Sequence, residues 1–259
     1  MRRMLLIGTF PLFALMAMAT AQDPAPKEPD KEVAEKIATL KECVLDRKMA
    51  RDDEGRRLID ELLLKLQAGV HPKDATAICK ALEDVFTKGK LRPPDQTSLY
   101  VAAAAALGYC GEDGAKVLKK AYDSKRFPDK KEWVPLREQL LKYLGRTKDE
   151  SMVKFLCNEA RRQPEAALQA AAGEALGNFE ESKEEIRKEI VGELLIRYGE
   201  LAELASQMGS SNIEAQNAQD RLATLSDKWN TALAKLTRQN FTAFRDWQAW
   251  YNKNRTQPW

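Results

Sequence analysis

The 259-residue sequence predicts an all-α protein built as an α-solenoid of about four helical hairpins, followed by a long helical hairpin and an aromatic C-terminal helix. One apolar segment occurs three times, at 99–108, 136–145 and 168–177, and each copy ends in Leu-Gly. The copies are spaced by about 35 residues, which is typical of stacked helical repeats. No window shows the alternating β-branched pattern of a strand. Such repeats bury their apolar faces against their neighbours, so we expect one continuous stack.

The beginning of the chain is predicted to be a removable export signal. The segment 1–21 starts with two arginines, continues with the apolar run 4–18 and ends in small residues, the order that signal peptidase recognises. This run is shorter than the roughly 20 residues that span a bilayer, and no later run is longer. We therefore expect an exported protein, periplasmic or secreted, with no integral membrane segment after cleavage. The Pro-rich residues 22–30 are expected to form an extended spacer.

The formal net charge of +3 falls to about +1 once the two arginines of the export signal are removed. A nucleic-acid-binding protein needs a basic excess to neutralise phosphates, so we expect no nucleic-acid partner. The charges are unevenly distributed, with a basic stretch at 116–148 and an acidic stretch at 165–204. Two interpretations stay open: a lengthwise dipole that steers a charged partner, or two solvated outer faces.

The individual helices are predicted from apolar residues spaced three and four apart. A helical repeat domain is expected over 31–204, and a helical hairpin arm with an aromatic cap over 205–259. Glycine after each repeated leucine is expected to end its helix in the left-handed conformation, and acidic residues begin the next helix. We expect an entry helix at 31–50. The first hairpin has one helix that ends near 67 and another at 73–87, the second hairpin has helices at 99–108 and 115–123, and the third has helices at 136–145 and 152–161. The fourth hairpin begins with a helix at 168–177, and two long helices follow at 181–208 and 213–238.

The segment 213–238 carries apolar residues at heptad-like spacing, from Ala215 to Leu236. One interpretation is an internal hairpin with the helix at 181–208. The other is a homodimer in which two copies of 213–238 meet along this seam.

Four cysteines follow the export signal, at Cys43, Cys79, Cys110 and Cys157. Export places them in an environment where disulfides form. Cys79 and Cys157 occupy the same slot two repeats apart, on the order of 20 Å, whereas a disulfide tolerates less than about 7 Å between Cα atoms. If two bridges form, we therefore expect Cys43 with Cys79 and Cys110 with Cys157. The alternative is four reduced thiols that pack as small apolar residues.

The sequence lacks the residue patterns of catalysis and of cofactor binding. Its one histidine, His71, lies in a predicted turn, and no cysteines or histidines have the spacing of zinc or haem ligands. The glycines of 108–114, followed by Lys116, do not match a phosphate-binding loop. Paired carboxylates such as Asp52 and Asp53 are interpreted as a solvated helix face. We expect a protein that is not an enzyme and that holds no cofactor and no metal.

The repeated unit resembles a HEAT repeat over about 53–204. The likeness is carried by the Leu-Gly helix ends, the acidic starts of the following helices and the apolar second helices. The run 232–241, followed by 247–251, is also similar to the C-terminal signature of exported bacterial HEAT-repeat proteins, with Arg238 where their common form has glycine. This resemblance implies a scaffold for protein interaction, and it implies no catalytic residues.

Two groups of side chains are candidates for binding. The first is a set of rings on both sides of one short C-terminal helix, including Trp247, Trp250 and Tyr251. These rings are expected either to seal the end of the stack or to form a patch that anchors a protein or stacks on a sugar. The second is a set of cations on second helices that would contact an acidic protein partner, namely Lys119, Lys120, Lys154 and Arg161.

The sequence thus favours a non-enzymatic, exported scaffold of the cell envelope that presents a helical-repeat surface to a protein partner. The alternative is a structural or glycan-associated protein of the cell wall that uses the C-terminal aromatic patch. Nothing in the sequence identifies the partner itself.

Overall fold

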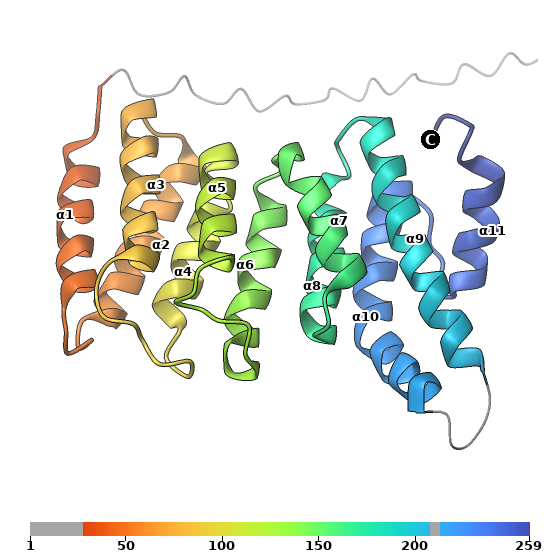
Figure 1. Ribbon diagram of the computed structural model, residues 1–259. Helices are drawn as coiled ribbons and strands as arrows, with labels where there is room; N and C mark the ends of the chain where they lie inside the picture. Colours follow the sequence, from red (N-terminus) through yellow and green to blue (C-terminus); the bar gives the residue numbers. More distant parts are fainter. Residues whose placement is uncertain (1–27, 208–212) are drawn as a thin grey trace, which may run out of the picture.

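The computed structural model describes residues 28–207 and 213–259 of the chain (Figure 1). Within these residues the protein is all-helical, as predicted, with no β-strand. The predicted export signal at 1–21 and most of the spacer at 22–30 lie outside the described residues. The helices are α1 (Lys31–Leu45), α2 (Asp52–Ala68), α3 (Pro72–Thr87), α4 (Ser98–Leu107), α5 (Gly111–Tyr122), α6 (Val134–Arg146), α7 (Val153–Arg162), α8 (Ala166–Leu176), α9 (Glu184–Ser206), α10 (Ile213–Thr237) and α11 (Phe244–Asn254), with short 3₁₀ segments η1 (Lys131–Trp133), η2 (Glu150–Met152) and η3 (Gly177–Phe179).

The helices lie side by side in two layers, and the chain alternates between the layers from one helix to the next (Figure 1). The A layer consists of α2, α4, α6, α8 and α10, each packed against the next. The B layer consists of α1, α3, α5, α7, α9 and α11. Neighbours within the B layer also pack together, except that α5 and α7 share few contacts among the described residues. The apolar core lies between the two layers along the whole length.

The entry helix is shorter than the predicted 31–50, because the chain turns after Leu45. Asp46 has an extended backbone conformation. Its carboxylate accepts hydrogen bonds from the main-chain N–H groups of Lys48 at 3.0 Å and Ala50 at 2.9 Å. An aspartate that binds nearby N–H groups in this way gives the backbone an alternative to the helix, so α1 ends here.

Two helix starts are held by side chains that accept hydrogen bonds from the first turn. At α1, the Asp30 carboxylate accepts a hydrogen bond from the N–H of Glu32 at 2.9 Å. At α3, Nδ1 of His71 accepts one from the N–H of Lys73 at 3.2 Å, and Pro72 is the first helical residue. The one histidine of the chain therefore caps a helix, which satisfies a main-chain donor that would otherwise lack a partner.

The glycines of the repeated Leu-Gly pairs do not take the expected left-handed conformation. Gly108 has a φ of −57° and Gly177 a φ of −63°, while Gly145 lies inside α6. These glycines instead allow close approach to the next A-layer helix. A Cβ on Gly145 would lie 2.4 Å from the carbonyl oxygen of Ala175, and one on Gly177 would lie 2.9 Å from Cα of Ala232. The Leu-Gly signature is therefore a packing feature between repeats.

The predicted helix at 213–238 is α10, which continues the A layer. Its apolar residues are buried against α8 and α9. Trp229 is fully buried and lies directly over Gly173 of α8, where an added Cβ would be 2.0 Å from the indole nitrogen. In the folded chain the apolar seam of α10 thus faces α8 and α9.

Candidate functional site

The cations predicted to bind an acidic partner lie on α5 and α7, and most of them are already paired. The ammonium nitrogen of Lys119 on α5 lies 4.2 Å from the ring centre of Phe155 on α7. Lys154 is exposed and has no ion pair among the described residues. The paired cations are Lys119 with Asp123, Lys120 with Glu83 at 2.7 Å, and Arg161 with Glu193 at 3.3 Å. Because neighbouring carboxylates compensate three of the four charges, this group presents little free positive charge.

The aromatic residues of α11 pack against the rest of the fold. Trp247 is fully buried, and its indole N–H donates a hydrogen bond to Oδ1 of Asn230 at 2.9 Å. Its ring meets the ring of Phe241 edge to face, with 4.9 Å between the centroids. Trp247 therefore belongs to the core and has no exposed surface for a partner.

Tyr251 and Phe244 fit against glycines of α9. A Cβ on Gly192 would lie 2.9 Å from the Tyr251 hydroxyl, and one on Gly199 would lie 2.8 Å from Cζ of Phe244. The two glycines thus leave the space into which the rings pack. The side chain of Tyr251 is half-buried as a result.

Trp250 is half-buried and packs edge to face on Trp259, with 5.0 Å between the ring centroids. Trp259 is in turn held by α9: the Arg187 guanidinium donates a hydrogen bond to its carbonyl oxygen at 2.5 Å, and Lys188 lies 5.5 Å from its ring centre. These contacts favour the interpretation in which the C-terminal rings seal the end of the stack.

The four cysteines are free thiols, so neither of the predicted pairs, Cys43–Cys79 and Cys110–Cys157, is bridged in the structure. Cys43 is a buried residue of α1 and packs against Gly55 of α2. Cys157 is buried on α7, and burial raises its pKa to about 12. The thiol of Cys110 donates a hydrogen bond to the carbonyl oxygen of Ala106, with 3.7 Å between the sulfur and the oxygen.

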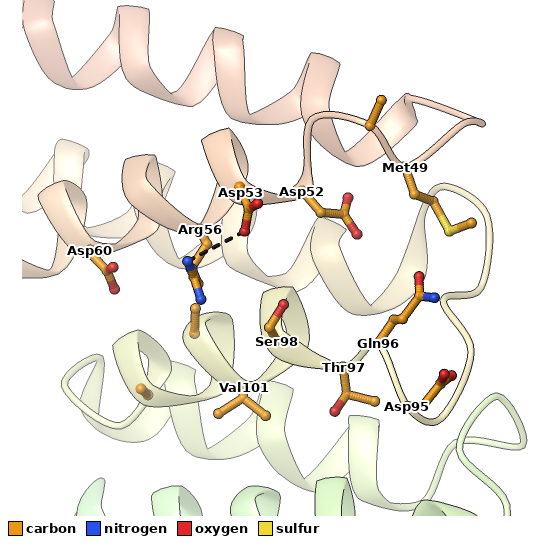
Figure 2. Close-up of a pocket in the computed structure, with 13 residues that line it drawn as sticks. Met49, Asp52, Asp53, Arg56, Asp60, Asp95, Gln96, Thr97, Ser98 and Val101 are labelled. Atoms are coloured by element: carbon orange, nitrogen blue, oxygen red, sulfur yellow. Dashed lines mark ion pairs between the residues drawn. The ribbon is translucent and has the colours of Figure 1, made fainter.

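A pocket of about 800 Å³ lies between α2 and α4 of the A layer, beside the loops that precede these two helices (Figure 2). Asp53 and Asp60 point into it from α2, and Ser98 and Val101 from α4. The full lining consists of Met49, Ala50, Asp52, Asp53, Arg56, Asp60, Asp95, Gln96, Thr97, Ser98, Val101, Ala102 and Ala105.

The pocket combines an acidic wall with an apolar floor of small residues. Arg56 pairs with Asp53 at 3.4 Å, whereas Asp60 and Asp95 are exposed and have no ion pair within the described part of the chain. Asp52 is not free, because the buried Arg92 binds its carboxylate. The floor consists of the half-buried residues Val101, Ala102 and Ala105. Such a site is suited to a ligand with positive charges next to small apolar groups.

This pocket was not predicted from the sequence, although part of the signal was present. The sequence analysis assigns Asp52 and Asp53 to a solvated helix face, and the run of alanines at 102–106 is the other part of the signal. On the outward side of α4 these small side chains leave a hollow opposite the acidic residues of α2 (Figure 2). Within the described residues, no group of three potential ligands gathers to hold a metal ion.

No protein-family model matches the sequence, and neither a curated protein nor a solved structure matches it. The resemblance to HEAT repeats therefore stays a prediction. Among the helices of residues 28–207 and 213–259, none has the length and apolar character needed to cross a membrane.

Proposed function

We propose that this chain is a non-enzymatic, exported protein-binding scaffold of the cell envelope, built as an α-solenoid of HEAT-like hairpins. The observation that carries the proposal is a contact repeated along the A layer: Gly108, Gly145 and Gly177 each lie against the next A-layer helix. Equivalent residues of three successive repeats thus make the same kind of contact, which is expected of units that stack by a common rule. Stacked repeats present extended surfaces that bind other proteins.

The pocket between α2 and α4 is the site at which we place the partner. Its acidic side chains favour a partner segment rich in lysine or arginine, and its floor of Val101, Ala102 and Ala105 accommodates small apolar side chains. The cations of α5 and α7 are a weaker choice because carboxylates already neutralise most of them. Export remains supported by the sequence of 1–21 alone.

Binding can be tested with two synthetic peptides of equal length, one alternating lysine with alanine and the other alternating glutamate with alanine. We expect the lysine peptide to bind, with an affinity that falls as salt concentration rises. Replacing the acidic wall in the triple variant Asp53→Asn, Asp60→Asn and Asp95→Asn should weaken its binding about tenfold at low salt, because exposed charge pairs contribute up to about 1 kcal/mol each. Fluorescence anisotropy of labelled peptide measures both effects.

A matched control removes three exposed carboxylates from the other layer, as Glu112→Gln, Asp123→Asn and Glu150→Gln. This variant changes the net charge by the same amount and should retain binding. Equal losses in the two variants, or equal binding of both peptides, would mean that the pocket is not the binding site.

The alternative function, a glycan-associated protein of the cell wall, receives less support from the arrangement of the C-terminal rings. Trp247 is buried, and Trp250 and Trp259 pack on each other. A sedimentation assay with purified envelope polymer separates the two functions, since the scaffold should remain in the supernatant.

A further inference from the structure

The end of α4 and the last turns of α6 form a patch of cations and aromatic rings on the A layer. The guanidinium carbon of Arg146 lies 5.5 Å from the ring centre of Tyr109 and 5.1 Å from that of Tyr143. The ammonium nitrogen of Lys142 lies 6.0 Å from the ring centre of Tyr143. Tyr109 is 45% exposed, so the patch is open to solvent. A guanidinium held against aromatic rings loses less freedom when it binds a partner.

The two cations of this patch have no carboxylate partner. Arg146 and Lys142 are half-buried, and within the described parts of the chain they form no ion pair and donate no side-chain hydrogen bond. They differ in this respect from Lys119, Lys120 and Arg161 of the B layer, which carboxylates already neutralise. The donor N–H groups of Arg146 and Lys142 are therefore available to carboxylates of another molecule.

The patch adjoins the pocket between α2 and α4. The Arg146 side chain reaches the end of α4, where a Cβ on Gly108 would lie 3.2 Å from its Cδ. Ala105 lines the pocket and precedes Gly108 by three residues, so the pocket and the patch lie on neighbouring turns of α4. Because α4 packs between α2 and α6 (Figure 1), acidic side chains on α2, small apolar side chains on α4 and cations on α6 follow one another across three helices.

We propose that the pocket and the patch together bind one extended segment of the partner protein, with basic residues at one end of the segment and acidic residues at the other. This inference rests on the proposed function, because the basic end occupies the pocket between α2 and α4. The acidic end pairs with Arg146 and Lys142. A segment that is basic throughout meets like charges at these two residues, so the patch also selects against it.

The packing of the A layer sets the distance between the two charged ends of the segment. Neighbouring packed helices are separated by about 8–10 Å, so α2 and α6, which flank α4, are about 16–20 Å apart. An extended chain advances about 3.3 Å per residue and covers this distance in about five or six residues. We therefore expect the nearest basic and acidic residues of the partner segment to be about five or six positions apart.

The test compares labelled peptides of equal length by fluorescence anisotropy at low salt. A bipolar peptide carries lysines at one end and glutamates at the other, with the nearest lysine and glutamate about six positions apart, and a basic peptide has glutamines in place of the glutamates. The bipolar peptide is made in both sequence orders, because either chain direction places its lysines over α2. We expect at least one order to bind about five- to tenfold more tightly than the basic peptide, because exposed ion pairs with two cations are added.

The double variant Lys142→Gln, Arg146→Gln should bind the bipolar and basic peptides equally. The matched control is Lys80→Gln, Lys154→Gln, which removes two exposed B-layer cations that have no ion pair within the described residues. This control should keep the full gain in affinity.

Equal binding of the bipolar and basic peptides by the unmodified protein would overturn this inference and leave the proposed function in place. That comparison does not depend on whether any variant folds. A gain that survives in Lys142→Gln, Arg146→Gln, or that is lost equally in the control, would also overturn the inference, because the carboxylates would then bind elsewhere. Failure of every peptide to bind would overturn both the inference and the proposed function.

Discussion

The guanidinium of Arg92 binds the carboxylate of Asp52 through two nitrogen atoms, at 2.7 Å from Nη2 to Oδ1 and at 3.0 Å from Nε to Oδ2. Arg92 is fully buried, and it also donates hydrogen bonds to the carbonyl oxygens of Cys43, Val44 and Lys90. One side chain thus joins the loop before α4 to the end of α1 and to the start of α2. These are the elements that border the acidic pocket.

Replacing Arg92 by alanine should lower the free energy of unfolding by about 3–5 kcal/mol, because Asp52 then loses its partner and the main-chain carbonyls lose their donors. Urea denaturation measures the change. Arg56→Ala is the control, since the exposed pair of Arg56 with Asp53 contributes about 0–1 kcal/mol. Similar losses in the two variants would contradict a special role for Arg92.

Replacing Gly145 by alanine should lower stability by about 1–3 kcal/mol, because the added Cβ collides with the main chain of Ala175 and forces α6 and α8 apart. Gly108→Ala should have a smaller effect. There the nearest atoms of α6 are 3.2 to 3.3 Å away, and one of them belongs to the flexible side chain of Arg146. Thermal unfolding followed by circular dichroism ranks the two variants, and the reverse order would refute this account of the repeated glycines.

Replacing single C-terminal aromatic residues by alanine should show, from the loss of stability, which rings belong to the core and which lie at the surface. Trp247→Ala removes a fully buried ring and a hydrogen bond to Asn230, so we expect a loss of about 3–5 kcal/mol in urea denaturation. Trp250→Ala removes mainly an edge-to-face contact with Trp259, so we expect about 1 kcal/mol. If Trp250→Ala left stability unchanged but abolished capture of a partner, the C-terminal rings would be a binding patch and not a seal.

Acid should weaken the start of α1. The Lys65 ammonium lies 2.7 Å from Asp30 and 2.7 Å from Glu32, and these contacts hold the pKa of both carboxyls below their ordinary values of 3.8 and 4.5. A carboxyl with a lowered pKa in the folded state stabilises the fold above its ordinary pKa, and this stabilisation is lost as the pH falls. Stability should therefore drop below about pH 4.5, in part through these groups.

The Lys65→Met variant checks this dependence. It should be less stable than the unmodified protein at pH 7 and should show a smaller drop in stability between about pH 5 and pH 3. Lys80→Met provides the comparison, because Lys80 is exposed and has no ion pair within the described residues. An unchanged pH profile for Lys65→Met would show that Asp30 and Glu32 are not stabilised by Lys65.

The all-helical class and the order of the helices were predictable because apolar residues recur three and four positions apart along most of the helices. The helix predicted from the copy at 99–108 is α4, Ser98–Leu107. The end of α1 was not predicted, since it depends on how the carboxylate of Asp46 binds two main-chain N–H groups. Local hydrogen bonds of this kind leave no periodic signal.

Long-range features were harder to predict. The role of Gly145 is set by Ala175 on another helix, and the burial of Arg92 is set by Asp52, 40 positions earlier in the chain. The pocket was missed for the same reason, because its two walls come from separate repeats.

The backbone at Arg238 agrees with the resemblance to HEAT-repeat proteins, although the residue type differs. Arg238 occupies the position where the resemblance expects glycine, and its φ of 58° is the left-handed conformation that glycine favours.

The unequal packing of the two layers has a mechanical consequence. Glycines bring the A-layer helices into main-chain contact at α6, α8 and α10, whereas α5 and α7 of the B layer share few contacts among the described residues. Side chains join these two helices instead: the ring of Tyr122 meets the ring of Phe155 edge to face with 5.7 Å between the centroids, and the Tyr122 hydroxyl donates a hydrogen bond to Glu159 at 2.5 Å. Bending between the half that carries the acidic pocket and the half that ends in the packed rings would therefore strain side-chain contacts in the B layer and main-chain contacts in the A layer.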